Sequence, residues 1–86
     1  MEYNYPLDYS WNTEEIILVV TLFNAVEQAY ETGIHKDEFM VAYKGFKQVV
    51  DSKSEEKQID KEFEKISGYS IYRIVTLAKD NDWLKA

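Results

Sequence analysis

Apolar side chains recur along most of this chain with the 3.6-residue period of an amphipathic α-helix. Residues 12–32 have the widest apolar face, formed by two neighbouring stripes that cover about half of the helix circumference. The stripes consist of Ile16, Val19, Val20, Phe23, Val26 and Tyr30, and of Leu18, Leu22, Ala25 and Ala29. Such a face must be covered from two directions. The pattern favours a central helix of the domain, and a homodimer through this first helix is the alternative.

Three further stretches, residues 36–50, 53–67 and 71–79, show the same period. Their apolar positions are Phe39, Tyr43, Phe46 and Val50 in the second helix; Ile59, Phe63 and Ile66 in the third; and Ile71, Ile74, Val75, Leu77 and Ala78 in the fourth. The third helix has few apolar residues, which predicts a peripheral position. No stretch shows the two-residue alternation of a half-buried strand, so no sheet is predicted.

Short polar side chains mark where these helices begin. Asn12 and Glu15 have the spacing of a capping box, in which each side chain accepts a hydrogen bond from the other residue's backbone N–H. Ser52 and Glu55 repeat this spacing, and Ser70 is placed to cap the fourth helix. Each predicted helix start except the second therefore has a strong N-cap residue.

Glycines mark where helices end. Gly33 and Gly68 follow the first and third helices, where a left-handed residue stops a helix. Gly45 lies inside the second helix, where it either permits a close helix contact or is tolerated at the surface. Residues 80–82 (Asp-Asn-Asp) are predicted to end the fourth helix, after which residues 83–84 either tuck back or fray.

The segment before the first helix, residues 3–11, contains four aromatic side chains and the only proline, Pro6. Proline fixes its own φ and pushes the residue before it toward an extended conformation. This leader is therefore predicted to be an extended strap that lies across the helices through its rings. The chain is predicted to be a single all-α domain over residues 1–86, a compact irregular array of three long helices and one shorter C-terminal helix.

Composition narrows the functional classes. The absence of cysteine excludes disulfides and thiolate metal sites. No apolar run approaches the ~20 residues of a membrane span, and residues 1–5 lack the basic start of a signal peptide. A cytoplasmic protein without membrane contact is therefore expected. The net charge of −6 disfavours nucleic acid and anionic membranes as partners.

The third helix carries two columns of opposite charge. The basic column consists of Lys53, Lys57, Lys61 and Lys65, and the acidic column of Glu56, Asp60 and Glu64. Their spacing allows i,i+3 ion pairs, each contributing only tenths of a kcal/mol. Both columns are predicted to form a solvated outer face.

No residue pattern spells out an active site. His35 is the only histidine and has no second histidine or cysteine with which to bind a metal, so a weak cap or an exposed position is expected. Glu14 and Glu15 are adjacent carboxylates, but they suit the positive end of the first helix. Phosphate-binding glycine loops and nucleophile elbows are absent. The chain is predicted not to be an enzyme and to need no cofactor or metal.

Two binding functions remain. Tyr69, Tyr72 and Arg73 form a candidate interaction surface, because tyrosine and arginine dominate interface hot spots. Alternatively, the hairpin around Gly68 resembles a helix-turn-helix that would bind nucleic acid. Glu64 weakens that alternative, since it occupies a first-helix position where a small apolar residue is expected.

Several segments together resemble uncharacterised protein family 0223, small cytoplasmic proteins of bacilli and their relatives. They are Tyr5-Pro6, Trp11-Asn12-Thr13-Glu14-Glu15-Ile16, Phe23 to Tyr30 with Ala25-Val26-Glu27, and Ser67-Gly68-Tyr69-Ser70 with Tyr72-Arg73. Two positions depart from the family pattern: His35, where an aspartate is expected, and Gly45, where a long polar residue is expected. The resemblance implies a compact helical fold and assigns no functional residue. The leading hypothesis is therefore a non-enzymatic protein-interaction module with an unidentified protein partner; the alternative is a small nucleic-acid-binding regulator.

Overall fold

Four helices make up most of the protein in a computed structural model that describes residues 5–86. Tyr3 and Asn4 of the predicted strap lie outside the described residues. The elements in chain order are α1 (Thr13–Glu31), β1 (Ile34–His35), α2 (Lys36–Val49), α3 (Lys53–Ser67), α4 (Ile71–Ala78) and β2 (Trp83–Leu84). Three long helices and a C-terminal helix of 8 residues confirm the predicted all-α fold.

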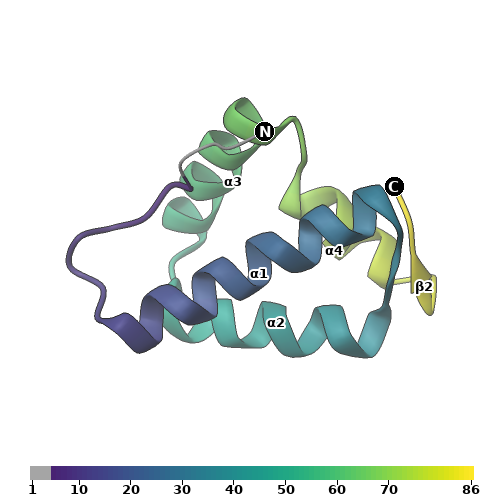
Figure 1. The fold of residues 1–86 in the computed structure, drawn as a ribbon, viewed down its shortest axis with the longest axis horizontal. Coiled ribbons are helices and arrows are strands. Elements are labelled where there is room, and N and C mark those ends of the chain that lie inside the picture. Colours follow the sequence, from purple (N-terminus) through teal and green to yellow (C-terminus); the bar gives the residue numbers. More distant parts are fainter. Residues whose placement is uncertain (1–4) are drawn as a thin grey trace.

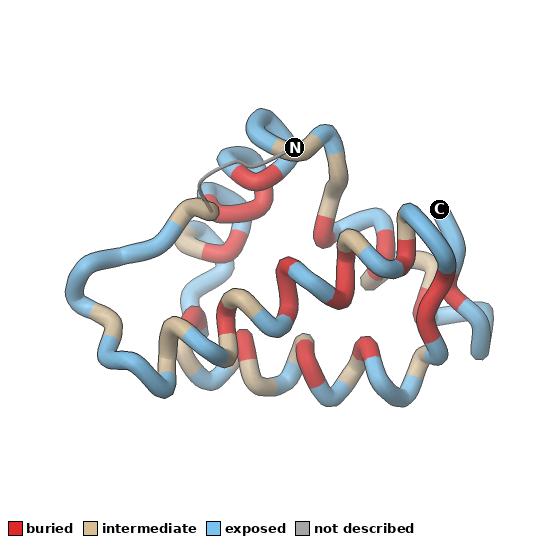
Figure 2. Tube along the Cα trace, viewed as in Figure 1, coloured by how far each residue is buried: buried red, intermediate tan, exposed pale blue. Residues whose placement is uncertain are grey.

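The helix α1 lies at the centre of this arrangement. It forms an antiparallel hairpin with α2, while α4 packs against it as well and α3 stands toward the other end of the molecule (Figure 1). Buried positions run along α1, whereas those of α2 are confined to the side that faces α1 (Figure 2). The wide apolar face of α1 is thus covered mainly from within the chain, although Ile17 remains 58% exposed.

Gly45 of α2 lies against the Leu18 side chain of α1. A Cβ atom at this position would lie 3.0 Å from Cδ2 of Leu18. Contacts that short are rare, so the missing side chain lets the two helices pack together. Of the two roles left open by the sequence, the structure favours the close helix contact.

The predicted helix starts are confirmed. Asn12 and Glu15 form both halves of the capping box, with N–O distances of 2.9 Å each. Ser52 accepts from the backbone N–H of Glu55, and Ser70 accepts from that of Arg73. At the other end of α3, Gly68 has φ +82°, the left-handed conformation that stops the helix.

The prediction that the chain has no strand is wrong for four residues. Ile34 and His35 pair antiparallel with Leu84 and Trp83, and Leu84 is fully buried. Two-residue strands are too short to show a two-residue period, so the sequence pattern carried no signal for them. Residues 83–84 therefore tuck back onto the α1–α2 turn.

The C-terminal segment also caps α1. The Lys85 ammonium group donates to the carbonyl oxygens of Glu31 at 2.8 Å and Tyr30 at 3.3 Å. The last turn of α1 contains no basic residue of its own. Lys85 thus supplies the positive charge that the C-terminal end of a helix favours.

The prediction that both charge columns of α3 are solvated is wrong for two carboxylates. Glu56 is 6% exposed and Asp60 9% exposed, whereas the four lysines and Glu64 lie at the surface. Ile66, predicted to face inward, is 37% exposed. The buried stripe of α3 consists of Glu56, Ile59, Asp60 and Phe63.

Each buried carboxylate ties α3 to another helix. Glu56 accepts from the Tyr43 hydroxyl at 2.5 Å and from the Lys47 ammonium at 2.6 Å, both on α2. Asp60 accepts from the backbone N–H of Ile71 at 2.8 Å, at the start of α4. Burial of a carboxylate is unfavourable unless it is hydrogen-bonded, so these partners explain why the two residues point inward.

Replacing Asp60 with alanine tests the role of this carboxylate. The buried N–H of Ile71 would lose its acceptor, so Asp60→Ala should lower the free energy of unfolding by about 2–3 kcal/mol. The matched control Glu64→Ala, four residues along the same helix and exposed, should change it by less than about 0.5 kcal/mol. Urea denaturation measures both values, and equal effects would contradict the assignment.

The two left-handed glycines should respond differently to alanine. At Gly68 a Cβ atom meets nothing within 4 Å, so Gly68→Ala should cost only backbone strain, about 1 kcal/mol. At Gly33, with φ +100°, the Cβ atom would lie 2.4 Å from the Trp83 ring. Gly33→Ala should therefore cost about 3 kcal/mol, from strain plus displacement of β2. Urea denaturation of both variants checks the order, which a larger loss for Gly68→Ala would contradict.

Candidate interaction surface

The structure separates Tyr69 from the other two residues of the predicted interaction surface. The Tyr69 ring stacks on that of Tyr30 with a centroid distance of 4.4 Å, and its hydroxyl donates to Glu31 at 3.2 Å. Burial and the Glu31 carboxylate raise the pKa of Tyr69 above its ordinary value. Tyr69 is thus a half-buried residue that fixes the α3–α4 turn on α1.

Tyr72 and Arg73 lie together on the outer face of α4. Tyr72 is 49% exposed, and Arg73 is exposed as well. With Thr76 and Leu77 they line a shallow cleft of about 210 Å³. Two of the three predicted residues therefore share a surface that a partner can reach.

The N-terminal end of α4 already holds a carboxylate. Asp60 accepts from the backbone N–H groups of Ile71 and Tyr72, and Ser70 accepts from that of Arg73. The free N–H groups at a helix start are the ones that bind phosphate. Because these groups are occupied at α4, this helix is poorly suited to approach nucleic acid by its N-terminal end.

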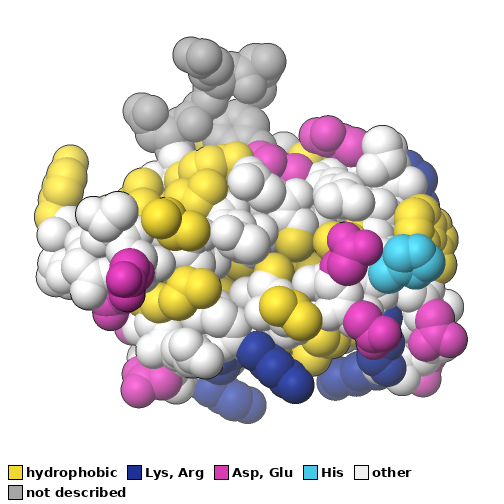
Figure 3. Space-filling model, turned by 60° about the horizontal axis from the view of Figure 1, so that its bottom comes forward, with side chains coloured by type: hydrophobic (Ala, Val, Ile, Leu, Met, Phe, Trp, Pro, Cys, Tyr) yellow, Lys and Arg dark blue, Asp and Glu magenta, His cyan; other side chains and the backbone are white. Residues whose placement is uncertain are grey.

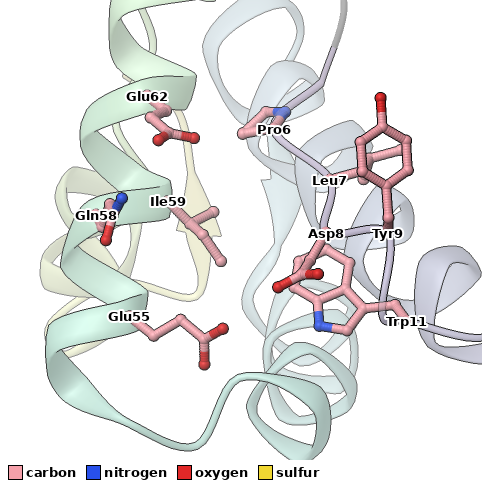
Figure 4. A pocket seen from close by; sticks show the side chains of 9 residues that line it. All are labelled: Pro6, Leu7, Asp8, Tyr9, Trp11, Glu55, Gln58, Ile59 and Glu62. Atoms are coloured by element: carbon pink, nitrogen blue, oxygen red, sulfur yellow. The ribbon is translucent and has the colours of Figure 1, made fainter.

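A second cleft, of about 320 Å³, lies between the strap and α3 (Figure 4). Glu55, Ile59 and Glu62 project from α3 toward the strap, and Asp8 and Trp11 lie on the opposite wall (Figure 4). The full lining is Pro6, Leu7, Asp8, Tyr9, Trp11, Glu55, Gln58, Ile59 and Glu62. We call it the strap cleft.

The strap is held at both ends. At one end, the Tyr5 hydroxyl donates to Glu27 at 3.0 Å, and the Tyr5 ring lies 5.0 Å from that of Phe23. At the other end, the partly buried Trp11 packs on the core. Between these anchors, Leu7 is 42% exposed and Tyr9 is fully exposed. The anchored ends keep the strap cleft formed, while the residues between them face solvent.

All charged residues that line the strap cleft are acidic, namely Asp8, Glu55 and Glu62. The Asp8 carboxylate accepts from the backbone N–H of Ser10 at 2.8 Å, which holds the pKa of Asp8 below its ordinary value. Within residues 5–86, the carboxylates of Glu55 and Glu62 have no hydrogen-bond or ion-pair partner. The strap cleft therefore presents unneutralised negative charge beside apolar side chains.

Sequence reasoning identified the aromatic strap but missed this cleft. The signal is the spacing of Glu55, Ile59 and Glu62, which places one apolar and two acidic side chains on the same face of α3. The opposite wall comes from residues about fifty positions earlier. Only the fold brings the two walls together.

The α1–α2 face is less continuous. Figure 3 shows apolar side chains on this face interspersed with polar atoms, with charged side chains along its lower edge. Ile17 of α1 and Val41 of α2 are exposed apolar residues of these two helices, at 58% and 73%. The predicted homodimer through α1 stays a prediction, with Ile17 as the exposed large apolar residue of α1 that a second copy could contact.

His35 and the acidic side chains of the described residues form no metal-binding cluster. His35 is exposed at the start of α2, makes no side-chain cap hydrogen bond, and contacts the Trp83 ring edge-on at 4.9 Å. No three His, Asp or Glu side chains in residues 5–86 lie close enough to hold a metal ion. In the same part of the chain, no helix combines the length and apolar character needed to cross a membrane.

Comparison with known sequences gives a family without a described activity. The profile of the Uncharacterised protein family (UPF0223) matches residues 2–85. A UPF0223 protein of Bacillus cytotoxicus is 57% identical over 82 residues, 95% of this chain and 92% of the relative. A UPF0223 protein of Bacillus mycoides is 51% identical, over 93% of this chain and 90% of the relative. A UPF0223 protein of Streptococcus pneumoniae is 54% identical, over 92% of this chain and 86% of the relative. These matches confirm the resemblance to uncharacterised protein family 0223 that the sequence motifs indicated.

Alkaline titration tests the buried tyrosine hydroxyls. Burial, and then the hydrogen bonds to Glu27 and Glu56, raise the pKa of Tyr5 to about 12 and shift that of Tyr43 upward as well. A raised pKa stabilises the fold fully below pH 10, the ordinary value, and this stability is lost as the pH rises through the folded pKa. Tyr43→Phe should therefore lower the free energy of unfolding at pH 8 by about 1 kcal/mol and reduce its decline above pH 10.

Urea denaturation at pH 8 and at pH 11 measures this difference. Tyr9→Phe is the matched control, because it removes a fully exposed hydroxyl. It should leave the free energy of unfolding unchanged at both pH values. An identical alkaline decline in wild type and Tyr43→Phe would contradict the assigned role of the Tyr43 hydroxyl.

Proposed function

The chain belongs to the Uncharacterised protein family UPF0223, and from that premise we propose that it is a non-enzymatic interaction module that acts through protein contacts. The observation that carries this proposal is the strap cleft. The strap is anchored at both ends and leaves Leu7 and Tyr9 exposed beside this cleft. Exposed apolar side chains grouped in this way are typical of protein-interaction sites.

The use of the buried titratable groups supports a non-enzymatic role. Glu56 holds Tyr43 and Lys47, and Asp60 caps α4. Every buried polar side-chain atom in the described residues has a hydrogen-bond partner. In a catalytic site, an acid or base with a shifted pKa remains accessible to substrate. In this protein, by contrast, the buried carboxylates form hydrogen bonds that join helices.

The surface formed by Tyr72 and Arg73 is a second contact region for the same function. Tyrosine and arginine are enriched in the residues that contribute most to protein binding. Both side chains are exposed on α4, on a helix whose position is fixed by Asp60. The two regions are separable by substitution.

A small nucleic-acid-binding regulator is the alternative function. The left-handed Gly68 turn joins α3 to α4 and leaves Arg73, Thr76 and Lys79 exposed. The net charge of −6 and the carboxylate of Asp60 at the start of α4 weigh against it. A binding titration with duplex DNA and RNA at low salt decides the matter, because phosphate contacts are strongest there.

Partner capture with surface variants tests the proposed function. Tagged protein is incubated with lysate from a bacterium that contains a relative, such as Bacillus mycoides. Specific captured proteins should be lost with Tyr9→Ala or with the double variant Tyr72→Ala/Arg73→Ala. Ile66→Ala changes an exposed apolar residue outside both regions and outside α1, so it is the matched control and should retain them. A monomer by light scattering that captures nothing specific would refute the proposal.

A further inference from the structure

We infer that the strap cleft binds a short protein segment in which lysine or arginine side chains flank an apolar one. This inference rests on the proposed interaction function and names the chemistry of the partner. It follows from the order of side chains along the cleft, from their charge and from the size of the cleft.

The wall formed by α3 alternates charge and apolar surface. Glu55, Ile59 and Glu62 lie on one helix face, with the isoleucine between the two carboxylates (Figure 4). Seven residues of helix span about 10 Å. Side chains on one face of an extended segment recur about every 7 Å, so the flexible side chains of lysines two residues before and two residues after an apolar one, about 13 Å apart, can reach both carboxylates. A bound segment can therefore place a cation at each carboxylate and an apolar side chain between them.

The opposite wall matches this order. Asp8 faces the cleft beside the Trp11 indole, and the Pro6 ring lies farther along the same wall, toward Glu62 (Figure 4). An apolar side chain entering the cleft would thus meet apolar atoms from both walls, with a third carboxylate close by. The exposed Leu7 and Tyr9 extend the apolar surface at the rim.

Charge determines which segment fits. No lysine or arginine lines the strap cleft, whereas Lys57 and Lys61 line a different depression of α3 together with Glu64. Lysine and arginine form charge-assisted hydrogen bonds with free carboxylates. Acidic segments and phosphate backbones would be repelled by the same three carboxylates. The volume of about 320 Å³ accommodates a few side chains.

Synthetic peptides test this chemistry without a known partner. The first probe is a nine-residue peptide with leucine at its centre. Lysines stand at every second position on either side of the leucine, and serines fill the remaining positions. In the second probe glutamates replace the lysines, and in the third serine replaces the leucine. Each is titrated into the isotopically labelled full chain, and backbone amide shifts are recorded by NMR.

The lysine peptide should shift the amide signals of Asp8, Trp11, Ile59 and Glu62. Its dissociation constant should be at least about tenfold lower than that of either other peptide, and should rise several-fold between 50 and 500 mM salt, as screening requires. Glu62→Gln should weaken binding about threefold or more. Glu64→Gln removes the same charge from the same helix outside the cleft and should leave binding unchanged.

Three outcomes would overturn the inference: no amide shifts, equal binding of the glutamate peptide, or shifts confined to Tyr72 and Arg73. The amide spectrum of each variant shows whether that variant is folded. The comparison of the three peptides uses the wild-type chain alone and does not depend on any variant. The proposed function is judged separately. Partner capture lost with Tyr72→Ala/Arg73→Ala would uphold that function even if the strap cleft bound no peptide.

Discussion

The placement of α3 depends on two carboxylates that point into the protein. Apolar burial alone holds this helix weakly, because its buried stripe contains only two large apolar side chains, Ile59 and Phe63. Glu56 and Asp60 complete the stripe, and the transfer of an unpaired carboxylate from water would be strongly unfavourable. The hydroxyl and ammonium groups of α2 and the helix start of α4 offset this penalty.

These partners also fix the rotation of α3 about its axis. A turn by one residue, about 100°, would carry Lys57 or Lys61 inward and expose the two carboxylates. A lysine turned inward would meet the Lys47 ammonium and the backbone N–H of Ile71, both of which are donors, so the rotated packing would place like charges together and lose the hydrogen bonds of both groups. The polar pairs therefore act together with the buried Ile59 and Phe63 to specify one orientation of α3.

Sequence reasoning reached the helices and their ends because those depend on local chemistry. The capping box of Asn12 and the left-handed Gly68 involve contacts within a few residues. Glu56 and Asp60 were placed on the outer face because carboxylates are usually exposed, and their partners lie 9–13 residues away for Glu56 and 10–12 for Asp60. A long-range partner leaves no trace in local spacing.

The sequence predicted only part of the candidate interaction surface. Exposed Tyr72 and Arg73 follow from helical spacing on α4. Tyr69 was grouped with them, but its ring stacks on Tyr30, thirty-nine positions earlier. The strap cleft lay beyond sequence reasoning altogether, because its walls belong to separate parts of the chain.

The strap cleft and the packing of α3 have a common physical origin. The face of α3 that carries Glu56 and Asp60 is occupied by α2 and α4, and the strap is attached at Tyr5 and Trp11. Neither attachment uses the carboxylates of Glu55 and Glu62. Glu55 is half-buried and Glu62 exposed, and neither carboxylate has a partner among the described residues. The same helix thus uses one pair of acids to join helices and leaves a second pair without a partner in the strap cleft, where we propose that a basic segment binds.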